Sequence, residues 1–178
     1  MTPHRIVPQI CLAGLILAGC QASTPDPNAA GHPDPPHAAS TPAAPSPGNV
    51  LTDPGNGTQC AGQNVHITRD DFRVVLEGDC GDIVVTASQG SLNVDRVRSI
   101  RVEGSQVTVL NEDVDSLTVI GNGNTFNMTR VGSAEIRGDG NGLLGKEYGK
   151  VVFGGSDNYV NADNQPAVED QGTQNRVI

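Results

Sequence analysis

The stretch that decides the fold is GNGNTFNMTRVGSAEIR, residues 121–137, followed directly by GDGNGLLGKEYGKVVFG, residues 138–154. The two segments align without a gap over 17 residues, and glycine, asparagine and apolar residues hold the same places in both. Self-similarity at a short fixed period is the sequence signature of a solenoid, in which each repeat stacks on its neighbours.

Working outward from these segments, the same step of 17 residues continues in both directions. One position is glycine in five successive repeats, at Gly104, Gly121, Gly138, Gly155 and Gly172. Another is asparagine in four successive repeats, at Asn124, Asn141, Asn158 and Asn175. Apolar positions recur in several parallel series, including Leu92, Val109, Phe126, Leu143 and Val160, and also Val85, Val102, Val119, Ile136 and Phe153.

Inside each repeat, apolar and polar residues alternate, as in Ile100-Arg101-Val102-Glu103. A period of two residues is typical of strands rather than helices. The sequence therefore predicts an all-β fold: a parallel β-solenoid (β-helix or β-roll-like) of about seven turns, each with about 17 residues and two short strands. The pattern leaves the handedness of the coil open.

The repeated glycine and asparagine positions favour structural roles. Glycine supplies turn dihedrals that other residues resist, and stacked asparagines can form a ladder of side-chain amides that satisfies the backbone at a corner. The alternative is a calcium site at these corners, for which Asp139 and Asp157 are the best candidates. Because asparagine is a neutral ligand and the glycine spacing differs from that of calcium-binding β-rolls, the ladder is the preferred interpretation.

A charged series alternates in sign along the repeat, at Asp79, Arg96, Asp113, Arg130 and Glu147. Stacked turns would place each charge beside opposite ones, and the pairs Arg98 with Asp115 and Lys146 with Asp163 would repeat the arrangement. Exposed pairs contribute only ~0.2–1 kcal/mol each, so we expect the charge ladder mainly to fix register. A charged face that binds a ligand is the alternative.

Two cysteines, Cys60 and Cys80, are predicted to form a disulfide that closes the irregular first turn, because the exported location inferred below permits one. At the other end, Asp170 falls in an inward apolar series and follows Pro166, and both residues would oppose the stacking of a further turn.

The N-terminal region has the sequence features of an export signal followed by a linker. Residues 1–19 have the layout of a signal peptide, and Leu17-Ala18-Gly19-Cys20 resembles the lipobox of bacterial lipoproteins. That resemblance implies acylation of the Cys20 thiol and cleavage before it. Residues 20–58 are rich in proline and alanine, which predicts a disordered tether, with His32 and His37 as a solvated pair rather than a metal site.

The composition limits the chemistry. A net charge of −9 argues against nonspecific nucleic-acid binding, which needs a basic surface. His66 is the single histidine after the tether, which removes most histidine-dependent triads and metal sites. We expect no cofactor.

The surviving enzyme hypothesis is a glycoside hydrolase or lyase that uses Asp95 and Glu112, which are one repeat apart. The preferred interpretation of these two residues is that they are solvated surface charges without a catalytic role.

The lipobox, the Pro/Ala-rich tether and a repeat domain that begins Cys-Ala-Gly-Gln-Asn-Val at Cys60 are together similar to a family of short bacterial repeat lipoproteins of unknown function. The resemblance covers roughly residues 58–178 and implies a β-solenoid without implying an activity. We therefore expect a solenoid domain at residues 59–178 in an exported lipoprotein, held in an outer membrane or at the cell surface through acylated Cys20. The expected function is non-catalytic: a monomeric domain that binds a cell-wall polymer or a protein partner. The alternatives are the enzyme and a purely structural surface protein.

Overall fold

The computed structural model describes residues 49–178, and its sheet begins at Val50. The signal peptide, Cys20, most of the tether, His32 and His37 lie outside the described residues and remain predictions. The strands are β1 (Val50–Thr52), β2 (Thr58–Gln59), β3 (Asn64–Ile67), β4 (Arg73–Val85), β5 (Gly90–Val102), β6 (Val107–Val119), β7 (Thr125–Ile136), β8 (Gly142–Phe153), β9 (Tyr159–Ala162), β10 (Ala167–Asp170) and β11 (Arg176–Val177).

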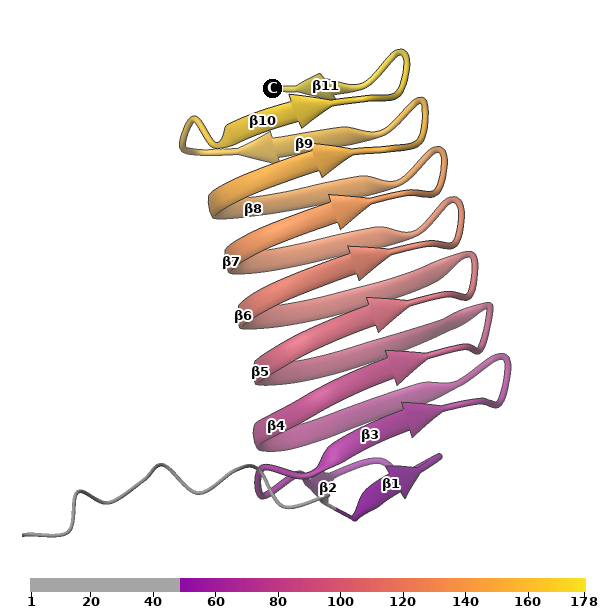
Figure 1. Cartoon of the computed structure of the whole chain (residues 1–178). Helices are drawn as coiled ribbons and strands as arrows, with labels where there is room; N and C mark the ends of the chain where they lie inside the picture. The colour runs from indigo at the N-terminus through magenta and orange to yellow at the C-terminus, as the bar shows by residue number, and fades with distance from the viewer. Residues whose placement is uncertain (1–48) are drawn as a thin grey trace, which may run out of the picture. The chain divides into compact units, whose positions relative to one another are not determined.

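All strand pairs are parallel, and β3 to β9 pair in chain order, each strand with the next. The prediction of an all-β parallel solenoid with turns of about 17 residues is confirmed. There are roughly eight turns rather than seven, because residues 50–59 pair with β3 and β4 and extend the sheet ahead of the expected boundary at residue 59. The chain runs along the front, returns along the back and rises, which makes the coil right-handed (Figure 1).

The two short strands expected in each turn merge into one strand of 12 or 13 residues in β4 to β8. Each long strand bends at a corner, where single positions drop out of the pairing between neighbouring turns. In the β5–β6 pair these positions are Asp95 with Glu112 and Arg98 with Asp115. Backbone pairing continues on both sides of the bend, so the corner does not end the strand.

The core consists of apolar columns that point inward from both halves of each turn, and the largest side chains within it are Phe126, Tyr148 and Phe153. Tyr148 replaces the valines of its column because Gly145 leaves room: a Cβ at residue 145 would lie 2.8 Å from the tyrosine ring. The Tyr148 hydroxyl donates to the Leu144 carbonyl at 3.3 Å, and burial raises the pKa of this hydroxyl.

The glycine column has a different cause from the one expected. Gly104, Gly121, Gly138, Gly155 and Gly172 are absent from the residues with left-handed φ. A Cβ on Gly121 would instead lie 1.8 Å from the carbonyl oxygen of Gly104 in the preceding turn, and the column repeats this contact. Close approach of stacked backbones, rather than a turn dihedral, is therefore what requires glycine here.

The left-handed residues form their own column, three positions before the inward apolar series that runs from Leu92 to Val160. Its members include Gln89, Gln106, Gly123, Gly140 and Asp157, with φ between 56° and 64°. Non-glycine residues are accepted there because this turn is exposed, and nothing lies within 4 Å of a Cβ at Gly123 or Gly140.

Among residues 49–178, no helix has the length and apolar character needed to cross a bilayer.

Candidate functional site

The asparagine column lies inside the solenoid and forms a continuous hydrogen-bonded ladder. Asn124, Asn141 and Asn158 are buried, and the backbone N–H of Asn124 donates to Oδ1 of Asn141 at 2.9 Å. The N–H of Asn141 donates in the same way to Asn158 at 2.8 Å, and that of Asn158 to Asn175 at 3.0 Å. Each amide thus satisfies a buried N–H of the adjacent turn, which is the structural role that the sequence suggested.

A second ladder follows the exposed corner beside the left-handed residues. The Oδ1 atom of Asn122 accepts the N–H of Asp139 at 2.7 Å, and Oδ1 of Asp139 accepts the N–H of Ser156 at 2.7 Å. Sequence reasoning missed this ladder, although its signal was present as a column of short polar side chains: Asp70, Ser88, Ser105, Asn122, Asp139, Ser156 and Thr173.

The structure gives the calcium candidates other roles. The Asp139 carboxylate accepts a backbone hydrogen bond within this ladder, and Asp157 occupies a left-handed turn position with φ 58°. In the described part of the chain, no three His, Cys, Asp or Glu side chains gather closely enough to hold a metal ion. His66, which was noted as the domain's one histidine, lies 3.3 Å from the Thr86 hydroxyl.

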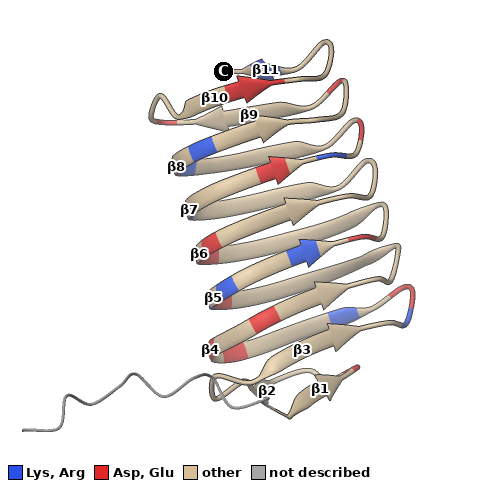
Figure 2. Ribbon diagram, in the orientation of Figure 1, with Lys and Arg blue, Asp and Glu red and all other residues tan. Residues whose placement is uncertain are grey.

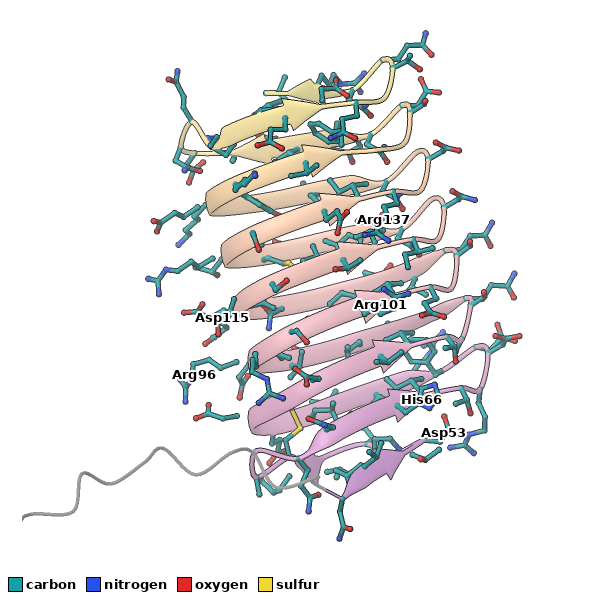
Figure 3. The ribbon with its side chains drawn as sticks, viewed as in Figure 1. Asp53, His66, Arg96, Arg101, Asp115 and Arg137 are labelled. Atoms are coloured by element: carbon teal, nitrogen blue, oxygen red, sulfur yellow. A yellow bond between two sulfur atoms is a disulfide. The ribbon has the colours of Figure 1, made fainter. Side chains whose placement is uncertain are left out.

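The five residues of the charge ladder lie in one register along the bent corner, and Asp79 pairs with Arg96, Arg96 with Asp113, and so on to Glu147. Arg96 contacts Asp79 at 2.6 Å, and Arg130 contacts Asp113 at 2.8 Å and Glu147 at 3.6 Å. The two arginine side chains are about 60% exposed, which keeps each contact weak. Figure 3 shows Arg96 and Asp115 projecting from this corner.

Two further predicted pairs are wrong. Arg98 contacts Asp82 in the preceding turn rather than Asp115, with Nε at 2.8 Å from Oδ1. This hydrogen bond lowers the pKa of Asp82 and raises the pKa of Arg98. Lys146 and Asp163 are not among the ion pairs of residues 49–178, where Lys150 contacts Glu169 instead. Arg98 and Asp115 lie at the bend, where single positions leave the strand pairing, and there the Arg98 side chain turns toward the preceding turn.

Asp95 and Glu112 also belong to those corner positions. Both are exposed, and neither is register-paired with the other. A shallow hollow beside Glu112 is lined by Arg96, Asp113, Thr129 and Arg130, and Asp95 does not line it. The residues on either side pair in register, Val94 with Asn111 and Arg96 with Asp113, so Asp95 and Glu112 lie on adjacent turns of an exposed corner, with the hollow beside Glu112 only.

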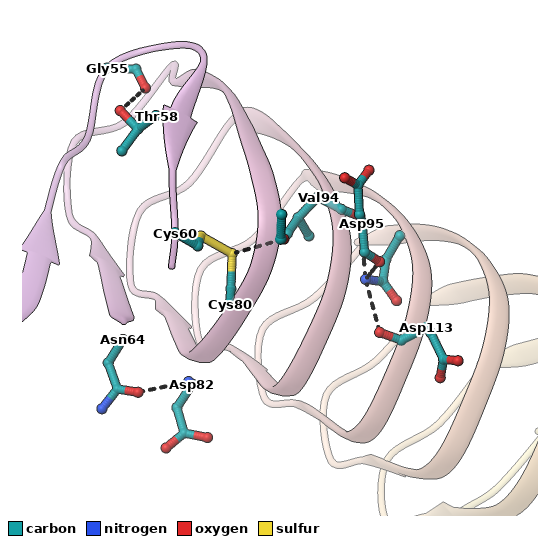
Figure 4. The surroundings of a disulfide bond; sticks show 11 residues. Gly55, Thr58, Cys60, Asn64, Cys80, Asp82, Val94, Asp95 and Asp113 are labelled. Carbon is teal, nitrogen blue, oxygen red and sulfur yellow. Dashed lines mark hydrogen bonds between the residues drawn. A yellow bond between two sulfur atoms is a disulfide. The ribbon is translucent and has the colours of Figure 1, made fainter. Parts of the chain in front are cut away.

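Behind this corner, Asn111 replaces an apolar residue of the core. Its Nδ2 atom donates to the Asp95 carbonyl at 2.8 Å and lies 3.4 Å from the Asp113 carbonyl (Figure 4). Its Oδ1 atom is buried without a hydrogen-bond partner. The amide thus satisfies backbone groups at the bend, and one acceptor is left over.

Figure 4 also shows the disulfide between Cys60 and Cys80, with Cα atoms 4.9 Å apart. Cys60 lies just after β2, and Cys80 lies in β4, so the bond fastens the first turn to the second. The extra residue of this irregular turn falls between Leu76 and Asp79, where Gly78 has φ 76°.

The structure reveals one surface that sequence reasoning did not identify. The outward residues in the first halves of β5 to β9 carry no charge, and the rear halves of β5 to β8 are tan in Figure 2 while the front halves and corners hold blue and red. We call this surface the uncharged face: Ser91, Asn93, Thr108, Leu110, Thr125, Asn127, Gly142, Leu144, Tyr159 and Asn161. The sequence did contain a signal for this face, because the residues on either side of the inward series Leu92, Val109, Phe126, Leu143 and Val160 are all uncharged.

At its C-terminal end the uncharged face includes an aromatic ring. A Cβ on Gly142 would lie 2.5 Å from Cζ of Tyr159, so this ring lies over the glycine of the preceding turn. The Arg176 guanidinium lies 5.5 Å from the ring centroid, which is a cation–π contact. Tyr159 is therefore outward and Tyr148 inward.

A scan against protein-family models, a search of curated proteins and a search of solved structures each found no match for this chain. The class that the structure itself defines is the parallel β-solenoid.

Proposed function

We propose that this chain is a non-catalytic protein of a bacterial cell envelope, exported and anchored in an outer membrane or at the cell surface through acylated Cys20. Its solenoid presents a surface that binds a cell-wall polymer or a protein partner. The lipobox-like Leu17-Ala18-Gly19-Cys20 and the Pro/Ala-rich segment 20–58 support the anchor and the tether.

The observation that supports a binding role is the in-register pairing of successive turns. From β5 to β8, outward residues on each half of the turn stack directly on those of the next turn. Such a surface is flat and repeats at the strand spacing of ~4.8 Å. Straight columns at a constant spacing suit a partner that is itself long and regular, such as a cell-wall polymer.

No observation favours the glycoside hydrolase or lyase. Paired carboxylates act as acid and base when their surroundings separate their pKa values and a cleft holds the substrate between them. Asp95 and Glu112 lie exposed on a convex corner, and the hollow beside Glu112 is lined by two arginines.

The test of binding uses a fragment of residues 43–178, which contains the whole described core. This fragment is mixed with peptidoglycan, outer-membrane glycolipid, capsular polymer and membrane proteins, and the bound fraction and the polymer length are measured. Binding without shortening is the expected result. Shortening that disappears in an Asp95→Asn, Glu112→Gln variant would establish the enzyme, and neither binding nor shortening would leave the structural protein.

The anchor has its own test. Cells that express the full chain are expected to incorporate labelled palmitate into it, and the Cys20→Ser variant is expected to lose both the label and membrane association. Label that persists in this variant would refute acylation at Cys20.

A further inference from the structure

We propose that the uncharged face binds a neutral β-1,4-linked glycan that lies along the solenoid axis, with one disaccharide for every two turns. This inference rests on the proposed function and deepens it, since it names the face and the chemical class of the polymer.

The first argument is a two-turn period on the face. One outward column alternates strictly between apolar and amide side chains, and its members pair in register from each turn to the next. The column reads Val75, Asn93, Leu110, Asn127, Leu144 and Asn161. The asparagines therefore recur every 34 residues, two strand spacings or ~9.6 Å apart.

This period fits the chemistry of a β-1,4-linked glycan. The linkage turns each sugar over relative to the one before it, so a given substituent returns to the same side once per disaccharide. The length of an extended disaccharide is close to two strand spacings. A glycan on this column would thus present its polar substituents to successive asparagines and the apolar faces of its sugar rings to the leucines between them.

The second argument is that the outward asparagine side chains are exposed and make no hydrogen bond within the described residues. Within residues 49–178, the amides of Asn93, Asn127 and Asn161 make no hydrogen bond, in contrast to the inward asparagines, and all three are exposed. Leu110 is 40% exposed, and Val75 in the same column is 37% exposed. Free amide donors and acceptors beside exposed apolar groups match the hydroxyl groups and ring faces of a sugar.

The third argument is charge. The chain carries a net charge of −9, and the opposite face carries Arg101, Glu103, Glu135 and Arg137 in two ion pairs. The uncharged face has no charged side chain over five successive turns. A neutral polymer is the complement of such a surface, whereas an anionic one would meet cations only at its two ends, where Arg73 and Arg176 continue the outward column of Ser91 and Tyr159.

The shape of the face favours a single polymer chain over a globular protein. It is two outward residues wide and five turns long, roughly 10 Å by 24 Å, which is about 240 Å². A specific protein interface needs about 800 Å² on each partner. A single extended glycan covers the narrow face completely.

The experiment measures the binding of neutral β-1,4-linked N-acetylglucosamine oligomers, from disaccharide to hexasaccharide, to residues 43–178 by calorimetry. Affinity is expected to rise as whole disaccharides are added. The test variant removes the three outward amides and is expected to raise Kd at least ten-fold: Asn93→Ala, Asn127→Ala and Asn161→Ala. The matched control truncates three uncharged residues of the opposite face and is expected to leave Kd unchanged: Ser116→Ala, Thr118→Ala and Ser133→Ala.

The outcomes separate this inference from the proposed function. The amide variant must first show the far-UV circular dichroism and urea midpoint of the parent, which the absence of internal bonds to these amides predicts. Binding of oligomers or of any envelope fraction that survives the amide variant would overturn the glycan face and leave the envelope-binding function standing. Binding to anionic polymers alone would do the same, and no binding to any fraction would overturn both.

Discussion

Replacing Gly121 with alanine is expected to destabilise the solenoid far more than replacing Gly123, two residues away. A Cβ at residue 121 would lie 1.8 Å from the carbonyl oxygen and 2.5 Å from the carbonyl carbon of Gly104. Both contacts are with backbone, so no side chain can rotate away. The two turns would have to separate by roughly 1 Å in a close-packed interior.

The magnitude follows from the bonds that this separation breaks. Ile120 donates to the Val102 carbonyl at 2.8 Å, and Asn124 donates to the Gly104 carbonyl at 3.1 Å. Overpacking costs about 1–3 kcal/mol, and each buried group left unpaired costs about 1–3 kcal/mol. The expected loss of about 3–9 kcal/mol is a large part of the ~5–15 kcal/mol that stabilises a domain.

Gly123→Ala is the matched control. Gly123 has φ 63°, and nothing lies within 4 Å of its Cβ position. Alanine there costs only the left-handed conformation, about 1–2 kcal/mol, and the same column already accepts Gln106 and Asp157.

Urea unfolding of residues 43–178, followed by far-UV circular dichroism, measures both losses, because the chain has no tryptophan to report by fluorescence. If Gly123→Ala proved as costly as Gly121→Ala, the close-approach explanation of the glycine column would be refuted.

Three further predictions concern the ladder, the disulfide and the buried tyrosine, and urea unfolding measures each. Asn141→Ala should cost about 2–4 kcal/mol, because it leaves the Asn124 N–H without its acceptor and removes a second hydrogen bond. Asn141→Asp keeps the acceptor, and since burial raises the pKa of a carboxyl, its stability should fall as pH rises from mildly acidic to neutral; a loss independent of pH would contradict this. Replacing Cys60 and Cys80 by serine should cost about 3 kcal/mol for a separation of 20 residues, and a reducing agent should have the same effect on the parent but none on the variant. Burial raises the pKa of Tyr148, so its contribution is complete below the unfolded pKa of ~10 and is lost as pH rises above it. Tyr148→Phe should remove this part of the alkaline destabilisation, and an unchanged alkaline profile would show that Tyr148 is not its source.

Much of the architecture was predictable because stacking gives every turn the same neighbours. Once the step of 17 residues is seen, residues such as Phe126 and Leu143 must share an environment, and alternation within a repeat decides which residues point inward. The same reasoning predicted the register of Arg96 on Asp113 and the amide ladder through Asn141. The Cys60–Cys80 bond was predicted on a different ground, the exported location that permits a disulfide in the irregular first turn.

The errors gather at the bends. A fixed step predicts that Arg98 faces Asp115, yet these positions leave the pairing at the corner, and Arg98 turns to Asp82. The glycine column was visible in the sequence, but its cause was not, because close approach to Gly104 and a left-handed dihedral both select glycine.

The sequence by itself determined the period, the strand character and the inward columns, since these depend only on spacing along the chain. The tertiary structure alone decided the handedness, the partners at the corner and the extent of the uncharged face. The corner partners and the extent of the face depend on where each turn bends, because the bend decides which exposed residues lie on a face and which lie on an edge. The handedness follows from the twist of the strands, which favours right-handed crossovers. The alternation of Asn93, Leu110 and Asn127 was present in the sequence throughout. It forms a surface only because the fold places those residues side by side on the uncharged face.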